Sequence, residues 1–434
     1  MQIAVVGCGY LGAVLSAVLA EQGNSVIGLD VDDMKVSQLN SGIAPFYEPE
    51  FDSVLQQSIS SGRLSFTTNA EKISDAEIVF ICVGTPQSQN TNAADLSQLW
   101  AAADAIAPHL APNAIVVGRS TVPVGTAAKL ESRINKKSGR KYSIVWNPEF
   151  LREGLAIGDT RTPDRIVIGT NNDFAENKLR ELYAPQLAKQ IPMLVLDVPT
   201  AELVKVSANA FLATKISFIN AIAEVADLAG ADIVQLADAI GLDSRIGRKF
   251  LAAGVGFGGG CLPKDIRAFI ASSNELGAES INRLLSEVDQ INLGQRDRVV
   301  NLAREILGEV KGMKIAVLGA AFKPNSDDVR DSPALEVAHM LHRLGALVFV
   351  HDPKALINAR AKFPDLNYQT DLNQVFKDCD LVLHLTEWQQ YRDLDPDQLR
   401  TLVNKPFIID GRNVLDFAAW RNAGWQITGL GKRD

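Results

Sequence analysis

The sequence predicts an α/β protein with two Rossmann-like, doubly wound sheets joined by a long central helix. Two short apolar runs each lead into a turn and a helical stretch. They are "IAVVG", near the N-terminus, and "KIAVLG", from residue 314. These two runs predict the first strands of two separate sheets. Between them, "AELVKVSANAFLATKISFINAIAEVADLAG", residues 201–230, predicts one long helix.

Bulk properties limit the classes of protein that need to be considered. A chain of 434 residues exceeds what one hydrophobic core usually supports, so two or three domains are expected. The formal net charge of -8 disfavours a nucleic-acid partner, because nucleic-acid binding needs a basic face. Anionic small molecules stay open as ligands, since backbone amides and a few cations bind them.

The cysteines and the apolar segments indicate a compartment. Cys8, Cys82, Cys261 and Cys379 are scattered, without a CxxC pair or a Cys/His cluster. We therefore expect no metal site and no disulfide framework, which fits a reducing, cytoplasmic environment. The N-terminus lacks the basic region of a signal peptide, and no run of 18 apolar residues follows, so no membrane segment is expected.

The first strand leads into the pattern of a dinucleotide-binding turn. Gly7, Gly9 and Gly12 form G-x-G-x-x-G, a helical stretch follows, and a second strand, "SVIGLD", ends at Asp30. In this motif the first glycine permits a tight turn, the second lets a pyrophosphate approach, and the third lets helix pack on strand. An acid at the end of the second strand binds a ribose 2′-OH and repels a 2′-phosphate. The pattern predicts NAD as cofactor.

Polar residues follow several later strands of the same region. Strands are expected within "AEIVFICVGTP", "AIVVGRSTVPVGT", "SIVWNPEF", "DRIVIG" and "MLVLD". The first three end in Thr85-Pro86, Ser120-Thr121 and Asn147-Pro148-Glu149. Any one of these is equally well an ordinary turn. Repetition over three strands favours ligand contact, because ligands bind at the carboxyl ends of the strands in such sheets.

The long central helix carries an unusual polar pair. Thr200 is the expected N-cap and Gly230 the expected C′ residue. Lys205 and Asn209, at i and i+4, share one face of a stretch that is apolar almost all round. A buried lysine is costly unless it is paired or used. The alternative is a surface pair of no consequence.

The segment "GVGFGGGCLPKD", residues 254–265, sets one cysteine behind five glycines. Pro263 suits the first position of a helix, so Cys261 is expected just ahead of a helix N-terminus, with Asp265 in the first turn. A helix N-terminus favours the thiolate form of a cysteine. A small buried cysteine is the ordinary alternative. The glycines favour a thiol that is offered to a ligand.

The last third of the chain predicts a second, smaller open sheet. "KIAVLG", "ALVFVHDP", "DLVLHLTEW" and "PFIIDGRNVLD" supply strands, and a helix is expected to begin at Ser332-Pro333. Only Gly319 of a glycine fingerprint is present, which argues against a second dinucleotide site while leaving room for another nucleotide. We predict domains at 1–198 (NAD-binding), 199–294 (central helical) and 295–434 (nucleotide-binding).

An NAD site, a thiolate-capable cysteine and a buried lysine together indicate one type of chemistry. A thiolate adds to an aldehyde, hydride loss gives a thioester, and water releases a carboxylate. A plain alcohol dehydrogenation needs no cysteine. The sequence therefore favours oxidation to the acid level.

At this point the chain resembles the nucleotide-sugar 6-dehydrogenases of the UDP-glucose/GDP-mannose dehydrogenase family. The resemblance runs from residue 1 to about residue 425. It rests on "GCGYLG", "FICVGTP", "STVPVGT", "NPEFLREG", "ELVKVSANAF", "SRIGRKF", "FGGGCLPKD", "AAFKPNSDDVRDSP" and "DGRNVLD". It implies two successive NAD-dependent oxidations at C6 of a nucleotide sugar. We expect conversion of UDP-glucose to UDP-glucuronate, with GDP-mannose as the alternative substrate.

The resemblance also implies roles for individual residues. Cys261 is implied as the nucleophile, Lys205 and Asn209 as oxyanion stabilisers, Asp265 as an assistant to water, and Glu149 as the base with Thr121 holding the water. The implied NAD contacts are Gly7, Gly9, Gly12, Asp30, Lys35, Thr85, Thr121, Glu153 and Arg330. The implied sugar-nucleotide contacts are Glu149, Phe150, Leu151, Arg152, Glu153, Lys205, Asn209, Arg245, Phe250, Gly258, Phe322, Lys323 and Arg412. Arg245 resembles an arginine that reaches a partner subunit, which implies a homodimer built on the helical region.

Departures from the family pattern leave alternatives open. Many relatives read "GGSCFPKD", whereas this chain has Gly260 and Leu262; neither change removes a reacting group. Lys264-Asp265 argues against the branch that acts on N-acetyl-hexosamines, which typically reads "GGxCIPVDP". A hydroxyacid dehydrogenase that transfers one hydride would not need Cys261. An inactive nucleotide-binding module should have lost part of the Cys, Lys, Asn and Asp set, and none is lost.

Overall fold

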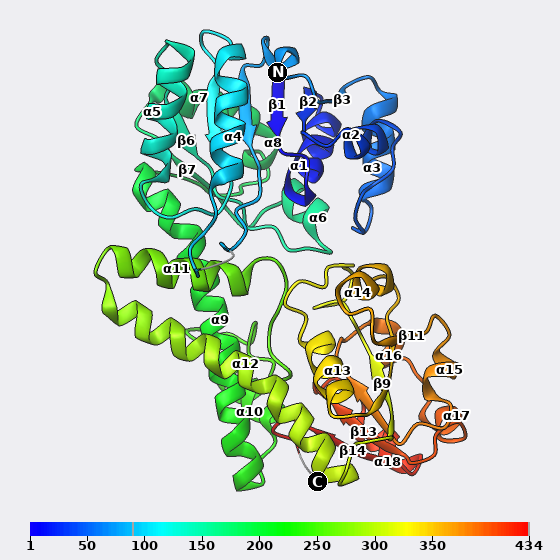
Figure 1. Ribbon diagram of the computed structural model, residues 1–434. Helices are drawn as coiled ribbons and strands as arrows, with labels where there is room; N and C mark the ends of the chain where they lie inside the picture. The colour runs from blue at the N-terminus through cyan, green and yellow to red at the C-terminus, as the bar shows by residue number, and fades with distance from the viewer. Residues whose placement is uncertain (89–90, 433–434) are drawn as a thin grey trace. The chain divides into compact units, whose positions relative to one another are not determined.

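The computed structural model describes residues 1–88 and 91–432, which form two compact units (Figure 1). Unit 1 comprises Met1–Ala208 and Ala271–Leu276, and unit 2 comprises Asn209–Ile270 and Gly277–Asp434. Each unit holds one sheet, so the predicted fold class is confirmed. The division into three domains at residues 198 and 294 stays a prediction.

Unit 1 is built on an eight-stranded sheet with the order β3-β2-β1-β4-β5-β6-β7-β8. Its strands are β1 (Gln2–Val6), β2 (Ser25–Leu29), β3 (Leu64–Thr67), β4 (Ile78–Ile81), β5 (Ile115–Gly118), β6 (Ile144–Trp146), β7 (Ile166–Gly169) and β8 (Met193–Leu196). All neighbours pair in parallel except β6 and β7. The strand order reverses between β1 and β4, which is where ligands bind in doubly wound sheets.

The inner strands of the unit 1 sheet, such as β1, β4, β5 and β7, are buried on both faces. Along β1, Ile3 and Val5 belong to one hydrophobic cluster, whereas Ala4 and Val6 belong to another on the opposite face. This explains why these strands read as continuous apolar runs rather than as alternating ones. The covering helices include α1 (Tyr10–Glu21), α2 (Asp33–Asn40), α3 (Phe51–Ser60), α4 (Ser97–Ile106), α5 (Thr126–Ser138), α6 (Ala156–Arg161), α7 (Asp173–Leu182) and α8 (Ala184–Leu187).

Unit 2 contains a six-stranded parallel sheet with the same kind of order, β11-β10-β9-β12-β13-β14. Its strands are β9 (Lys314–Leu318), β10 (Leu347–His351), β11 (Asn367–Tyr368), β12 (Leu381–His384), β13 (Phe407–Asp410) and β14 (Gln426–Gly429). Helix α13 (Pro333–Arg343) begins where expected, with Ser332 as its N-cap. The shorter helices are α14 (Leu356–Lys362), α15 (Leu372–Phe376), α16 (Gln389–Arg392), α17 (Pro396–Arg400) and α18 (Phe417–Asn422).

Helices dominate the middle of the chain. They are α9 (Val198–Ala229), α10 (Ile233–Gly241), α11 (Leu262–Glu275) and α12 (Glu279–Leu307). The prediction that Thr200 is the N-cap is wrong, because α9 begins at Val198. Asp197 precedes the helix, and its carboxylate accepts the Thr200 N–H at 2.8 Å. Gly230 follows the helix with φ +69°, as a C′ glycine does.

Helix α9 is long and apolar enough to cross a membrane by length and composition alone. Only 39% of its most apolar window is buried inside the structure. The core helix of a soluble protein passes the same test, so this finding is weak evidence for a membrane span.

Candidate active site

The glycine-rich turn between β1 and α1 has the geometry that a dinucleotide needs. Gly7 has φ +89°, and a Cβ on Gly12 would lie 1.9 Å from the Gly7 carbonyl oxygen. A Cβ on Gly9, in contrast, would meet nothing within 4 Å. Gly7 and Gly12 are therefore required by the protein's own packing, and Gly9 leaves the space beside the α1 N-terminus open for a pyrophosphate.

Asp30, at the end of β2, is buried and tied to that turn. Its carboxylate accepts the Cys8 backbone N–H at 2.7 Å, and the Lys35 ammonium lies 3.1 and 3.2 Å from its two oxygens. The Asp30–Lys35 pair places two of the predicted NAD contacts side by side. The turn and this acid fit the adenosine end of NAD.

The ends of β4 and β5 are joined by side-chain hydrogen bonds. The Thr85 hydroxyl donates to the Thr121 carbonyl at 2.8 Å, and the Ser120 hydroxyl donates to the Val83 carbonyl at 2.6 Å. The "STVPVGT" turn is also held from α9, because the buried Glu202 carboxylate accepts backbone N–H groups at the start of α5. Thr85 and Thr121 are thus brought together at the switch point of the sheet.

Glu149 follows β6 and forms an ion pair with Lys205 of α9. The Lys205 Nζ lies 3.1 Å from Glu149 Oε1, and both side chains are largely withdrawn from solvent. Glu149 Oε2 accepts the Leu151 backbone N–H at 2.5 Å. The predicted buried lysine is therefore paired, as its burial requires.

Opposing influences act on the Glu149 carboxyl group. Burial raises its pKa, whereas the Lys205 ammonium, the Leu151 N–H and the Arg119 guanidinium lower it, and the net pKa lies below its ordinary value. Glu149 is consequently a carboxylate at neutral pH and a weak base in this state. It acts on Lys205 as a fixed counter-charge.

Sequence reasoning missed the residues that hold the "NPEFLREG" segment. The Glu48 carboxylate accepts the backbone N–H groups of Gly154 and Ala156 at 2.6 and 2.7 Å, and it also accepts the Tyr10 hydroxyl. Burial raises the pKa of Glu48. No local pattern marks Glu48 in the sequence, because its backbone partners, Gly154 and Ala156, lie more than 100 residues away.

The predicted sugar contacts in this segment are only partly brought together. Phe150 has the Arg165 guanidinium 3.7 Å from its ring centroid and the Lys205 ammonium at 5.7 Å. Arg152, in contrast, pairs with Asp159 at 2.5 Å and is half exposed. Leu151 and Glu153 are partly buried beside them.

Cys261 lies in unit 2, directly before α11. Its carbonyl accepts the Asp265 N–H at 3.0 Å, which is the first helical hydrogen bond and marks Cys261 as the N-cap. Cys261 therefore lies just before a helix, as predicted. The helix begins at Leu262, one residue earlier than Pro263 indicated. Cys261 is partly exposed, whereas Cys8, Cys82 and Cys379 are buried.

Asp265 is the buried centre of this part of unit 2. Its two oxygens accept from the Asn209 amide at 2.7 Å and pair with the Lys264 ammonium at 2.5 Å. Sequence reasoning used Lys264 only to choose between family branches and missed its pairing with Asp265. Asn209, Asp265 and Cys261 are thus joined through one carboxylate and one helix turn.

The glycines before Cys261 pack against protein. A Cβ on Gly258 would lie 2.1 Å from the Asp331 carbonyl oxygen, and one on Gly259 would lie 2.6 Å from the Phe322 ring. A Cβ on Gly260 would overlap the Arg330 guanidinium. We expected these glycines to serve a ligand; in this structure, close approach to the loop after β9 is reason enough for them.

The other predicted contacts in unit 2 have different surroundings. Arg412 donates to the carbonyls of Leu385, Gly256 and Phe322 at 2.7, 3.0 and 3.3 Å, so its guanidinium holds three segments together. The Lys323 ammonium lies 5.5 Å from the Phe322 ring centroid.

Three predicted contacts lie on the surface of unit 2. Arg245 is 86% exposed and pairs with Asp243 at 2.6 Å. Phe250 is exposed and has φ +65°. Arg330 pairs with Asp328 at 2.6 Å.

The sheet of unit 2 repeats the acid of the first sheet but uses it differently. Asp352, at the end of β10, accepts backbone N–H groups from Ala320 and Ala321 at 2.8 and 3.0 Å, and the Trp388 indole N–H at 3.1 Å. Lys354 and Ala355 also donate to it. Five donors occupy this carboxylate, which supports the expectation that unit 2 lacks a second dinucleotide site.

No group of three or more His, Cys, Asp or Glu side chains is arranged to hold a metal ion within residues 1–88 and 91–432.

A Rossmann sheet with an open glycine turn and an acid at the end of its second strand is typical of a dinucleotide-binding protein. Residues 1–187 match the NAD binding domain of the UDP-glucose/GDP-mannose dehydrogenase family. Residues 199–293 match its central domain, and residues 316–417 match its UDP binding domain. The chain belongs to this family.

Individual relatives agree with this assignment. The UDP-glucose 6-dehydrogenase TuaD of Bacillus subtilis is 42% identical over 99% of this chain and 93% of its own. A solved UDP-glucose dehydrogenase of Pyrobaculum islandicum is 39% identical, with a TM-score of 0.92 over 99% of this chain and 98% of its own. A solved GDP-mannose dehydrogenase of Pseudomonas aeruginosa is 29% identical, with a TM-score of 0.54 over 99% of this chain and all of its own.

Asp30→Asn should relax the choice between NAD and NADP. Wild-type kcat/KM should strongly favour NAD, because the Asp30 charge repels a 2′-phosphate. The amide removes that charge and leaves Lys35 to attract the phosphate, so kcat/KM for NADP should rise about tenfold, equivalent to about 1.4 kcal/mol. The double variant Asp30→Asn/Lys35→Met should not show this gain. Equal wild-type values for the two cofactors would overturn the role of Asp30.

Lys205→Met should make the protein less stable as pH rises. In the wild type the lowered pKa of Glu149 gives stability that is present above its unfolded pKa and is lost only as pH falls through the folded value. Without Lys205, burial should raise that pKa, so the variant should lose stability as pH rises. We expect a Tm deficit of about 5–10 °C at pH 8 that shrinks toward pH 4.

The control for this experiment is Lys178→Met. Lys178 pairs with Glu77 at 2.9 Å on the surface, so its loss should shift Tm by less than about 2 °C at any pH. A Lys205→Met deficit that is independent of pH would contradict the proposed coupling to Glu149.

Proposed function

We propose that the protein catalyses the NAD-dependent four-electron oxidation of UDP-glucose to UDP-glucuronate through a covalent bond to Cys261. The observation that carries the proposal is the position of Cys261 at the N-terminus of α11, one turn before an Asp265 fixed by Asn209 and Lys264. An alcohol dehydrogenase that stops at the aldehyde needs no such thiol.

The reaction divides into three steps. The C6 alcohol first loses a hydride and a proton to give the aldehyde. The Cys261 thiolate then adds to the aldehyde carbon, and loss of a second hydride from this thiohemiacetal gives a thioester. Water cleaves the C–S bond, which releases the carboxylate and regenerates the thiol. NAD, when bound, accepts one hydride in each oxidation.

The side chains around the thiol suit the charges that develop. Asn209 gives one amide N–H to Asp265, and its second N–H can bind the oxyanion of the thiohemiacetal. The family resemblance implies Lys205 as a second oxyanion stabiliser, and it keeps that proposed role. Asp265, anchored at both oxygens, orients the Asn209 amide and is proposed to assist the attacking water.

Glu149 is assigned a modest role as base. Its lowered pKa makes it a weak proton acceptor, but a thioester is activated toward attack and needs less assistance than an ester. We propose that Glu149 and Thr121 orient the hydrolytic water. The other predicted NAD and sugar contacts retain their proposed roles.

The choice of UDP-glucose over GDP-mannose rests on the relatives. The UDP-glucose enzyme of known structure aligns with a TM-score of 0.92, against 0.54 for the GDP-mannose enzyme. A direct comparison of NADH formation with both sugar nucleotides tests it. A cytoplasmic location fits an enzyme that uses these soluble metabolites.

A homodimer is the proposed assembly. Helix α9 exposes a stripe of apolar side chains in unit 2, consisting of Phe211, Phe218, Val225 and Leu228. Phe211, Phe218 and Val225 recur every seven residues, so they lie along one side of the helix. Exposed stripes of this kind mark protein interfaces. Arg245, exposed in the same unit, is proposed to enter the partner's site.

Phe218→Glu should dissociate the dimer and abolish activity. A buried carboxylate in the apolar stripe is costly, and the monomer lacks the partner's Arg245. Light scattering should show half the wild-type mass. Phe174→Glu is the matched control, because Phe174 is an exposed phenylalanine on α7 of unit 1 and its variant should remain dimeric. A fully active monomer would exclude the role of Arg245.

Cys261→Ala should abolish uronic acid formation and leave NAD binding intact. Cys261→Ser should be more informative, because its ester hydrolyses more slowly than a thioester and covalent enzyme should accumulate. Intact-protein mass spectrometry after mixing with UDP-glucose and NAD should show an added mass that matches the glucuronyl nucleotide. Acid formation by Cys261→Ala at the wild-type rate would refute the covalent role.

A further inference from the structure

The buried glycine-rich segment before Cys261, residues 254–260, forms its hydrogen bonds with other parts of the chain. Residues 254–260 form neither helix nor strand, yet they are buried. Buried backbone N–H and C=O groups must be paired. Gly254 donates its N–H to the Asn220 side chain at 2.8 Å, and Val255 donates to the Gly411 carbonyl at 2.8 Å.

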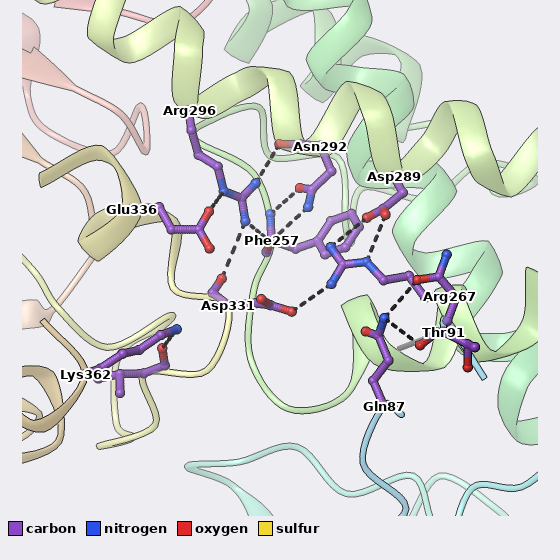
Figure 2. A network of polar contacts seen from close by, with 12 residues as sticks. Gln87, Thr91, Phe257, Arg267, Asp289, Asn292, Arg296, Asp331, Glu336 and Lys362 are labelled. Carbon is purple, nitrogen blue, oxygen red and sulfur yellow. Dashed lines mark hydrogen bonds and ion pairs between the residues drawn. The ribbon is translucent and has the colours of Figure 1, made fainter. Parts of the chain in front are cut away.

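Phe257 is held by one side chain on both of its backbone groups. Its N–H donates to Asn292 Oδ1 at 2.7 Å, and its carbonyl accepts from Asn292 Nδ2 at 3.1 Å (Figure 2). The carboxamide of Asn292 thus imitates the paired hydrogen bonds of a neighbouring β-strand. Asn292 lies on α12 and is fully buried.

The approach to Asn292 is so close that the chain tolerates little movement there. Gly256 has φ +91°, and a Cβ on it would lie 2.5 Å from Asn292 Oδ1. The segment is therefore restrained by two hydrogen bonds and by a direct steric limit at the adjacent residue. A shift of the carboxamide must shift the main chain.

Arg296, one turn further along α12, supports this arrangement. Its guanidinium donates to the Asn292 carbonyl at 2.8 Å and to the Phe257 carbonyl at 3.4 Å, and it pairs with Glu336. Figure 2 shows the guanidinium between Glu336 and the Phe257 backbone. Asn292 thus belongs to a network that is fixed from α12 and α13.

A second arginine ties the helix that begins after Cys261 to the same network. Arg267 of α11 pairs with Asp289 of α12 at 2.9 Å and with Asp331 at 3.2 Å (Figure 2). The chain is therefore anchored to α12 on both sides of Cys261, at Phe257 before it and at Arg267 after it.

We propose that Asn292 is a positioning residue for the nucleophile, because its carboxamide fixes the main chain at Phe257 and thereby the place of the Cys261 thiol. The proposal rests on the covalent role of Cys261 given above. Asn292 touches no reacting atom. It acts through the three residues between Phe257 and Cys261, whose backbone path is confined by the packing of Gly258, Gly259 and Gly260.

The expected effect is on chemistry rather than on cofactor binding. Misplacement of a reacting group by about 1 Å can lower a rate about 100-fold. Asn292→Ala removes both hydrogen bonds to Phe257. Asn292→Asp keeps the acceptor for the Phe257 N–H but sets a carboxylate oxygen against the Phe257 carbonyl. Both variants should lower kcat about 10- to 100-fold and leave KM for NAD within about twofold.

The reactivity of the thiol gives a readout that does not depend on turnover. Cys261 is the partly exposed cysteine, and burial raises the pKa of Cys82 and Cys379 to about 12 and that of Cys8 as well. Iodoacetamide should therefore label Cys261 first, which mass spectrometry of the peptide verifies. The rate of labelling should change at least about threefold in both Asn292 variants.

Gln295→Leu is the matched control. Gln295 is a fully buried amide on the same helix, but its hydrogen bonds reach only Ile291 and Arg298 of α12 itself. This variant should keep the wild-type kcat and labelling rate, even if its Tm falls. If Asn292→Ala does not fold, Asn292→Asp decides the question.

The outcomes distinguish failure of the positioning role of Asn292 from failure of the covalent role of Cys261. Wild-type kcat and labelling rate in folded Asn292→Asp would overturn the positioning role, as would equal losses in Gln295→Leu. A lower Tm with unchanged kcat and labelling would show a merely structural role and would also overturn it. Acid formation by Cys261→Ala would instead refute the covalent mechanism, while the labelling rates would still test the position of the thiol.

Discussion

The proposed chemistry depends on the burial of one carboxylate. Asp265 is withdrawn from water, so its charge has to be matched by the Asn209 amide on one oxygen and by Lys264 on the other. Because Asp265 also donates its backbone N–H to Cys261, the same residue fixes α9 against the first turn of α11. The hydrogen bonds that a buried carboxylate requires also fix the position of the Asn209 amide and of the Cys261 main chain. Burial of this charge therefore helps to position the groups proposed to react.

Two sheets with the same strand order use the same acid for different purposes. In unit 1, Asp30 accepts two backbone N–H groups, from Cys8 in the glycine turn and from Asp32, and its carboxylate also lies beside the Lys35 ammonium. In unit 2, the Asp352 carboxylate accepts five hydrogen bonds from the protein, and two of them come from the loop after β9. The same strand order therefore surrounds two acids with different numbers of protein donors, which leaves Asp30 more room than Asp352 to accept a ligand.

Much of the fold could be predicted from local pattern. The apolar runs that became β1, β4 and β9 are buried on both faces, and such runs are readable without knowledge of their neighbours. The short edge strands β3 and β11 were missed because an edge strand carries half the apolar signal. The cofactor turn was readable because its glycines have fixed spacing. Glu48, Arg296 and Asn292 were not, because their partners are distant in sequence and only the folded chain brings them together.

The contact between Gly260 and Arg330 has a consequence for any substitution at residue 260. A side chain there would occupy the space that the Arg330 guanidinium fills, so the two positions share one volume. The guanidinium is the far end of a flexible side chain, so even a serine at residue 260 would displace it. Such a substitution would therefore change the cationic surface next to the cysteine without removing a charge.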